Sequence, residues 1–332
     1  MEPYFSEKFV TSFQQSASAT AAVGAMPSLA FDSNNNPMIA SYNGAAAEQN
    51  LILARSADRG VSFSITVVDN IAANVGQFPS LAASGEALGI AYYDVTNTAL
   101  KFARWTQAGG WKRYTVDGAA GAGSCGNAAS DAGKFAKLQF TSTGRPAIVY
   151  QYDTGVRIAY ATEALTSATY VWTCVSMESS GSVLGAGLDF KLDSDDLVYA
   201  TYADSTAGSV RFATCATAVG TCVSTGTSAF TSSLVEVTGV TTSVGESTPS
   251  LGLGTDGAVY LSYHNSTTKA LRLATKAAGA SSFTLENLDQ STLTGPVTVG
   301  QYGSLLVNSA DRPTVFYRSS ENWLRYFSRE ED

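Results

Sequence analysis

The side chains that could bind or transform a small molecule fall into two repeated groups along this chain. The first group follows a recurring apolar strand that ends in tyrosine, directly in five copies and after Ala203 in the fourth. Its members are polar and differ from copy to copy: Asn43, Asp94, Asp153, Asp204, His264 and Arg318. Structural repeats should look alike, so unlike polar residues at matching loop positions indicate a binding surface. Simple drift of loop residues is the competing interpretation.

The second group stands where the first strand of each copy begins. It contains aromatic rings beside amides and charged groups: Met26, Gln77, Phe78, Lys134, Phe135, Glu246, Gln301 and Tyr302. This mixture suits sugars, because the apolar face of a pyranose stacks on a ring and its hydroxyls bond to planar polar groups. Alternatively, the rings only plug a narrow channel.

Two enzymatic chemistries can be written with these residues. Tyr263 and His264 could remove a proton beside a uronic acid, as in a polysaccharide lyase, with Arg318 or Lys134 neutralising the uronate. A glycosidase would need two carboxylates roughly 5–10 Å apart. Candidates for those are Asp94, Asp153, Asp204 and Glu246. Because His264 is the only histidine, the sequence predicts no metal site and no cofactor.

A repeated strand unit must position both groups. Six apolar strands end in tyrosine, at Tyr42, Tyr93, Tyr152, Tyr202, Tyr263 and Tyr317. Each follows a strand that contains leucine, and each precedes a third strand whose second residue is basic in five copies: Lys101, Arg157, Arg211, Arg272 and Arg325. Since the tyrosines and the basic residues recur, we expect them to be structural, with the basic residues pairing between neighbouring repeats.

The repeat length predicts the fold class. A period of about 40–50 residues with four short strands is typical of a β-propeller blade. We therefore expect an all-β, six-bladed propeller of four-stranded blades, forming one domain over residues 1–332. The expected blades are approximately 24–70, 76–117, 133–177, 184–237, 245–289 and 300–332. The last repeat stops at its third strand, so residues 1–12 should complete it and close the ring.

One short segment resembles a known family motif. Ser56-Ala-Asp58-Arg-Gly60-Val-Ser-Phe63 is similar to the Asp-box, S-x-D-x-G-x-x-W, of sialidases and other propellers with bacterial neuraminidase (BNR) repeats. Phe63 replaces the tryptophan. The resemblance implies a sialidase-like propeller in which the box is a folding device on the face opposite the binding site. Sialidases also carry an Arg-Ile-Pro motif, which is absent here, so sialidase activity is not expected.

Composition limits the partners and the compartment. With 20 Lys and Arg against 28 Asp and Glu, the net charge is −8, and no basic run is present to bind nucleic acid. No apolar stretch is long enough for membrane insertion. The four cysteines predict the disulfides Cys215–Cys222 and Cys125–Cys174, and hence a secreted, periplasmic or cell-surface protein. No signal peptide is visible at Met1, so we expect any leader to have been removed.

These observations favour a lectin-like propeller over an enzyme. We expect a carbohydrate-binding or adhesion module whose partner is a glycan or glycoconjugate, bound at the mouth of the channel, as part of a larger surface assembly. A polysaccharide lyase or glycosidase acting on an acidic glycan is the first alternative. A scaffold that binds proteins is the second.

Overall fold

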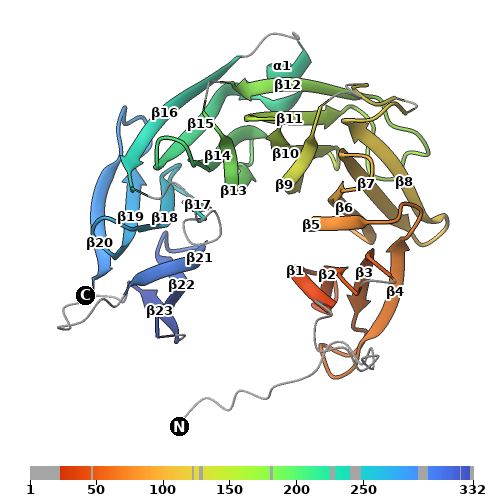
Figure 1. The fold of residues 1–332 in the computed structure, drawn as a ribbon, viewed down its shortest axis with the longest axis horizontal. Helices are drawn as coiled ribbons and strands as arrows, with labels where there is room; N and C mark the ends of the chain where they lie inside the picture. Colours follow the sequence, from red (N-terminus) through yellow and green to blue (C-terminus); the bar gives the residue numbers. More distant parts are fainter. Residues whose placement is uncertain are drawn as a thin grey trace. The chain divides into compact units, whose positions relative to one another are not determined.

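The computed structural model describes residues 23–45, 48–121, 123–126, 130–179, 182–224, 229–239, 248–290, 298–321 and 323–329. The described chain is almost entirely β-structure, with one short helix, α1 (Val219–Ser224). Its strands form six antiparallel sheets, each built from strands that are consecutive in the sequence (Figure 1). Glu246 and the expected closing strand, residues 1–12, lie outside the described residues.

Five sheets have four described strands and the sixth has three. Sheet 1 contains β1 (Val23–Phe31), β2 (Pro37–Asn43), β3 (Asn50–Arg55) and β4 (Ser64–Asp69); sheet 2 contains β5 (Val75–Ser84), β6 (Ala87–Asp94), β7 (Ala99–Thr106) and β8 (Gly110–Asp117). Sheet 3 contains β9 (Ala132–Phe140), β10 (Pro146–Tyr152), β11 (Gly155–Ala161) and β12 (Trp172–Glu178).

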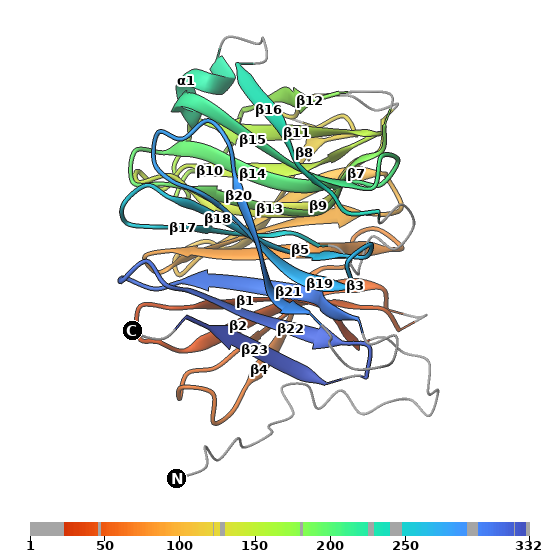
Figure 2. The same ribbon diagram turned by 90° about the vertical axis from the view of Figure 1, so that its left-hand side faces the viewer.

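Sheet 4 contains β13 (Leu184–Leu192), β14 (Leu197–Asp204), β15 (Ser209–Ala218) and β16 (Phe230–Val237). Sheet 5 contains β17 (Ser250–Leu253), β18 (Val259–Asn265), β19 (Ala270–Lys276) and β20 (Thr284–Gln290). Sheet 6 contains β21 (Val299–Val307), β22 (Pro313–Ser319) and β23 (Leu324–Ser328). Figure 2 shows these later sheets, coloured green to blue, from a second direction. The all-β class and the six consecutive sheets confirm the repeat read from the sequence.

Contacts within the chain define two compact units. Unit 1 is Met1–Ile148 with Ala161–Trp172, and unit 2 is Val149–Tyr160 with Thr173–Asp332. Within unit 1, apolar residues of sheets 1 and 2, including Leu51 and Ile90, form a shared buried cluster. Within unit 2, sheets 4 and 5 share one cluster around Phe212 and Leu261, and sheets 5 and 6 share another. Each core therefore lies between successive sheets.

The Ser-Leu pairs of the repeat have a structural explanation. The Ser28 hydroxyl accepts a hydrogen bond from the Leu81 amide in the following sheet, at 2.9 Å. Ser80 accepts from Leu138, and Ser250 accepts from Leu305. In sheet 4 a carboxylate of the same register, Asp189, accepts the Leu251 amide. A side chain of one sheet thus satisfies a backbone amide in the first strand of the next sheet. Pairing shifts form a bulge near the start of β1, β5, β13 and β21.

The segment that resembles an Asp-box forms the turn between β3 and β4. The Ser56 hydroxyl accepts the Gly60 amide at 2.8 Å, and Asp58 accepts both the amide and the hydroxyl of Ser62. Those bonds, with Ser62 first, lower the pKa of Asp58 to about 2. Gly60 has φ +90°, which a side chain would strain. The half-buried Phe63 ends the turn.

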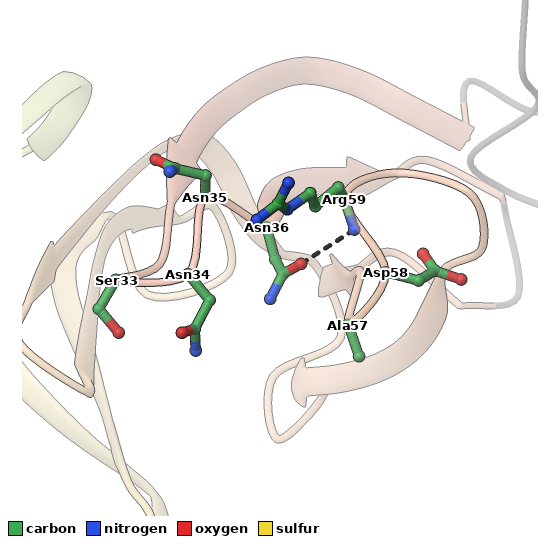
Figure 3. Close-up of a pocket in the computed structure, with 7 residues that line it drawn as sticks. All are labelled: Ser33, Asn34, Asn35, Asn36, Ala57, Asp58 and Arg59. Carbon is green, nitrogen blue, oxygen red and sulfur yellow. Dashed lines mark hydrogen bonds between the residues drawn. The ribbon is translucent and has the colours of Figure 1, made fainter.

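Beside this turn lies an open depression (Figure 3). Its lining residues come from the β1–β2 turn and the box itself: Ser33, Asn34, Asn35, Asn36, Ala57, Asp58 and Arg59. The Arg59 amide donates to Asn36 Oδ1 at 2.9 Å, which links the two turns. The depression lies at the opposite end of β1 from the bulge.

All four cysteines are oxidised. Cys215 and Cys222 form a disulfide that joins β15 to α1. Cys125 and Cys174 are also disulfide-bonded, so the described chain has no free cysteine. A search of the described residues finds no helix with the length and apolar character needed to cross a membrane.

Candidate functional site

We call the first strand of each sheet its inner strand. Near the start of five inner strands, one residue lies in the left-handed backbone region. The residues are Met26 (φ 53°), Phe78 (φ 50°), Phe135 (φ 55°), Gly187 (φ 59°) and Tyr302 (φ 53°). For a non-glycine residue this conformation costs about 1–2 kcal/mol. Sheet 4 has glycine there, and a Cβ on Gly187 would lie 2.7 Å from the Thr248 backbone, whereas four other sheets place a large side chain at this position. The two pairing shifts around these residues create the bulge.

In unit 1 the bulge residues come together. The rings of Phe78 and Phe135 lie 4.5 Å apart between centroids, and Phe78 is 6.4 Å from the ring of Tyr93. The Phe78 amide faces Met26 Sδ at 3.4 Å. Met26 is 42% exposed, and both phenylalanine rings are partly exposed. The structure therefore places an accessible apolar surface of three side chains on neighbouring inner strands.

A polar group borders this apolar surface. Lys134 Nζ lies 2.5 Å from Asp131 Oδ2 and 5.6 Å from the centre of the Tyr93 ring. The Tyr93 hydroxyl donates to Asp131 Oδ1 at 2.7 Å. Burial, then the hydrogen bond to Asp131, raise the pKa of Tyr93, so its hydroxyl stays protonated. The half-buried Gln77 lies next to Phe78, and its amide has no partner among the described residues.

We call these seven residues the Phe78 cluster: Met26, Gln77, Phe78, Tyr93, Asp131, Lys134 and Phe135. The sequence predicts Gln77, Phe78, Lys134 and Phe135 as binding residues and places Met26 in the same group. It does not identify Asp131 or the contact that Tyr93 makes with it. Asp131 and Lys134 are three residues apart in the sequence, but only the folded structure shows that both contact Tyr93.

In unit 2, Tyr302 and Arg318 form a smaller exposed pair. The Arg318 guanidinium carbon lies 5.6 Å from the centre of the Tyr302 ring, and Tyr302 is 50% exposed. The neighbouring Gln301 is buried. This pair occupies the same place in sheet 6 that the aromatic bulge residues occupy in unit 1.

Three members of the first predicted group are buried and hold loops. Asp94 accepts the amide and side chain of Asn97, Asp204 accepts the amides of Thr206 and Ala207, and Asn43 accepts the Ala45 amide. Their exposed fractions are 2%, 4% and 1%. Asp153 is exposed in the tight β10–β11 turn with φ 49°. These three side chains therefore hold their own loops and do not form an exposed binding surface.

His264 is buried as well. Its Nδ1 lies 2.7 Å from the Val299 carbonyl at the start of β21. Gln151 occupies the matching place in sheet 3, and its amide donates to the Leu184 carbonyl at the start of β13. Thus His264 and Gln151 each contact the backbone carbonyl that begins the following sheet. His264 therefore links sheet 5 to sheet 6.

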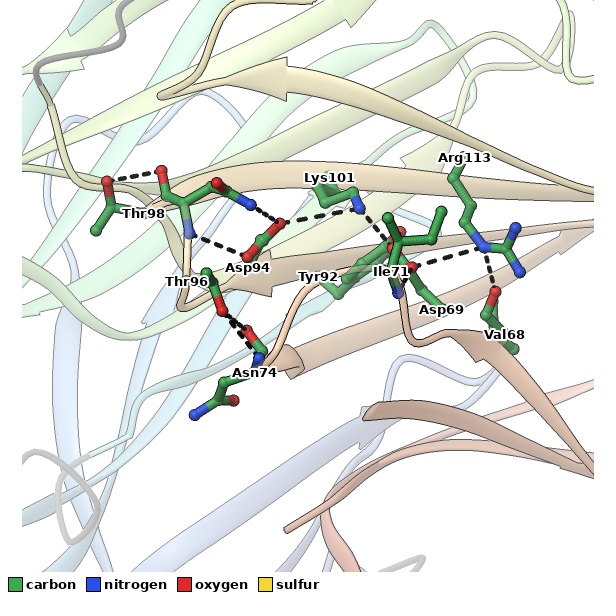
Figure 4. A network of polar contacts seen from close by, with 11 residues as sticks. Val68, Asp69, Ile71, Asn74, Tyr92, Asp94, Thr96, Thr98, Lys101 and Arg113 are labelled. Carbon is green, nitrogen blue, oxygen red and sulfur yellow. Dashed lines mark hydrogen bonds and ion pairs between the residues drawn. The ribbon is translucent and has the colours of Figure 1, made fainter. Parts of the chain in front are cut away.

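A second repeated network joins an acid at the end of one sheet to a tyrosine and a base of the next. In Figure 4, Asp69 accepts the Tyr92 hydroxyl and the Lys101 ammonium, both at 2.6 Å, with Arg113 beside it. Unit 2 contains three counterparts, Tyr202–Glu178–Arg211, Tyr263–Glu236–Arg272 and Tyr317–Asp289–Arg325. The expected pairing of the repeated bases is confirmed at these four junctions.

The network corrects the alignment of the repeats. The tyrosine of sheet 2 that corresponds to Tyr202 and Tyr263 is Tyr92, not Tyr93, because Tyr92 pairs with Lys101 as Tyr263 pairs with Arg272. By the same register, sheet 1 has Ser41 opposite Ile52 at this place and lacks the network. Adjacent tyrosines in sheet 2 made the shift by one residue invisible in the sequence.

These tyrosines are poorly placed for catalysis. Burial, then the hydrogen bond to Glu236, raise the pKa of Tyr263 far above its usual range, so the phenol remains protonated. Its side chain is fully buried, and its hydroxyl already donates to Glu236 at 2.7 Å. Within either unit, no three described His, Cys, Asp or Glu side chains are grouped closely enough to hold a metal ion.

No family model matches the chain, and no curated protein sequence matches it either. Solved structures do resemble it. The NanB sialidase of Streptococcus pneumoniae aligns with a TM-score of 0.54 and 11% identity, over 97% of this chain and 69% of that one. The intramolecular trans-sialidase of Ruminococcus gnavus, in complex with oseltamivir carboxylate, aligns with a TM-score of 0.54 and 11% identity, over 94% of both chains.

The intramolecular trans-sialidase of the leech, complexed with 2,7-anhydro-Neu5Ac, aligns with a TM-score of 0.53 and 12% identity, over 92% of this chain and 68% of that one. At such low identity the likeness concerns the fold alone. Together with the six antiparallel sheets, it shows that this chain has a β-propeller fold of the sialidase type.

Proposed function

We propose that this protein is a non-enzymatic carbohydrate-binding propeller whose ligand docks on the Phe78 cluster. The observation that carries the proposal is backbone strain: Phe78 and Phe135 are held at φ 50° and 55°, where glycine would be more stable. Two accessible aromatic rings are thus kept despite the cost in backbone strain, and contact with a ligand would explain why they are kept.

The chemistry of the cluster supports a sugar ligand. Phe78, Phe135 and Met26 offer an apolar surface for the C–H face of a pyranose, while the Gln77 amide and the Asp131 carboxylate can bond to hydroxyls. The proposal extends to a secreted, periplasmic or cell-surface location, supported by two disulfides. Likeness to carbohydrate-active propellers is consistent with it but concerns the fold.

The enzymatic alternatives receive less support. A lyase built on Tyr263 and His264 would need both groups to reach the substrate, yet both are buried and hydrogen-bonded. A glycosidase built on Asp94 and Asp204 would need carboxylates that already hold loop amides. A protein-binding scaffold has no observation in its favour at the Phe78 cluster.

The test is a double variant, Phe78→Gly with Phe135→Gly, screened with wild type on a glycan array. Glycine keeps the left-handed backbone and removes only the rings, so the free energy of unfolding should change by no more than about 1–2 kcal/mol. Affinity for whichever glycan the wild type binds should fall by about tenfold or more, because central aromatic contacts dominate such sites.

The matched control is Phe31→Ala, which removes a ring that is 54% exposed on β1 of the same unit, away from the cluster. This variant should bind as wild type does. Undiminished binding by the double variant would place the ligand elsewhere. Product release from any array glycan would replace the lectin-like proposal with an enzyme.

A further inference from the structure

The charges at the Phe78 cluster cancel locally. Lys134 is its only cation, and the ammonium is 2.5 Å from the Asp131 carboxylate, its only anion. Their side chains are 38% and 36% exposed, so both stand where a ligand could reach them. The Tyr93 hydroxyl bonds to the second oxygen of Asp131 and fixes the carboxylate beside the rings.

An anionic sugar would meet two obstacles here. Its carboxylate would have to displace Asp131 from Lys134, because the cluster holds no other positive charge to receive it. It would also approach the Asp131 carboxylate, and like charges within a few ångströms repel. A neutral sugar meets neither obstacle, since its hydroxyls can donate to Asp131 and accept from Lys134 and Gln77.

We infer that the Lys134–Asp131 pair makes the Phe78 cluster selective for neutral pyranosides over sugars that carry a carboxylate. This inference rests on the proposed carbohydrate binding and names the substrate class of the same site. Asp131 is the specificity-determining residue: it occupies the ammonium that would otherwise attract a uronate or a sialic acid.

The experiment compares matched sugars and three proteins. The probes are galactose against galacturonic acid, and lactose against 3′-sialyllactose, each as an immobilised glycoside at low salt. Wild type should bind the neutral member of a pair at least fivefold to tenfold more tightly. Asp131→Asn keeps the shape and the Tyr93 contact but leaves Lys134 without its partner, so the preference should shrink by about fivefold or reverse.

Lys134→Gln is the reciprocal variant. It removes the ammonium beside the Asp131 carboxylate, so rejection of the acidic member should become stronger. Both substitutions remove only an exposed ion pair, so the thermal midpoints should stay close to that of wild type. The ratio of the affinity for the neutral sugar to the affinity for the acidic sugar separates charge selection from a general loss of binding.

Three results would overturn the inference or its basis. A wild type that prefers the acidic members refutes neutral selectivity while leaving carbohydrate binding intact. Equal shifts of both members in Asp131→Asn show that Asp131 does not select by charge. Absence of binding to every neutral and acidic probe, and to a broad array, refutes the proposed function and this inference with it.

Discussion

At the scale of single residues, the clearest energetic feature is a buried carboxylate held by its neighbours. Asp69 is fully buried, and burial alone would raise its pKa, but the Lys101 ammonium and the Tyr92 hydroxyl outweigh burial and lower it below the ordinary 3.8. Asp69 therefore stabilises the folded protein as an anion. In unit 2, Glu178, Glu236 and Asp289 each accept bonds from a tyrosine hydroxyl and an arginine at the corresponding place.

We predict that Lys101→Met destabilises the protein by about 2–4 kcal/mol at pH 7, because Asp69 stays buried and loses its nearest cation. Urea unfolding measures this change, and Lys112→Met, an exposed lysine on β8, should change stability by less than about 0.5 kcal/mol. Equal effects of the two substitutions would argue that the Asp69 network is energetically neutral.

The acid side of the stability profile provides an independent prediction. A carboxyl group whose pKa is lowered on folding contributes stability above its unfolded value, near 3.8, and that contribution is lost as the pH falls through the lower folded value. The difference between wild type and Lys101→Met should therefore shrink below about pH 4. A constant difference from pH 7 to pH 3 would assign the effect to packing of the lysine stem.

At the scale of elements, the bulge depends on a glycine that precedes it. Gly76 has φ +108°, and a Cβ there would lie 2.7 Å from the Leu51 backbone of β3. Gly133 faces Leu100 and Gly300 faces Leu271 in the same way. β5, β9 and β21 thus begin against the third strand of the preceding sheet, with no room for a side chain.

We predict that Gly76→Ala lowers the free energy of unfolding by about 3 kcal/mol or more, through strain and displacement of a neighbouring backbone. The control is Gly85→Ala in the β5–β6 turn, which has φ +58° but open space around the Cβ. Its cost should be only about 1 kcal/mol, the strain alone. Similar losses for both would mean that the close approach to Leu51 relaxes freely.

The elements were more predictable than the site. Alternating apolar strands and turn residues recur in phase, so the six sheets and their order could be inferred from the sequence. The bulges could not be inferred, because a shift in the pairing of two strands leaves no mark in the spacing of residues along the sequence. Asp131 was missed for that reason, and the first predicted group included Asp94 and Asp204, whose burial depends on how each loop folds back.

At the scale of the whole molecule, the net charge of −8 opposes capture of anionic polymers. Binding of a neutral glycan to the Phe78 cluster should therefore change by less than about twofold between 50 and 500 mM NaCl, because no ion pair forms with the ligand. Titration at several salt concentrations measures this. A steep fall in affinity with salt would reveal an ionic ligand instead.

The left-handed position near the start of the inner strands carries different side chains on one backbone conformation. Methionine, phenylalanine, tyrosine and glycine all occupy one backbone conformation in different sheets, with φ between 50° and 59°. At Gly187 a Cβ would lie 2.7 Å from the Thr248 backbone, so that place accepts no side chain, whereas the other four places already carry large ones. Exchange of Phe78 and Phe135 for other large side chains should therefore change which ligand the Phe78 cluster binds while the strand backbone stays the same.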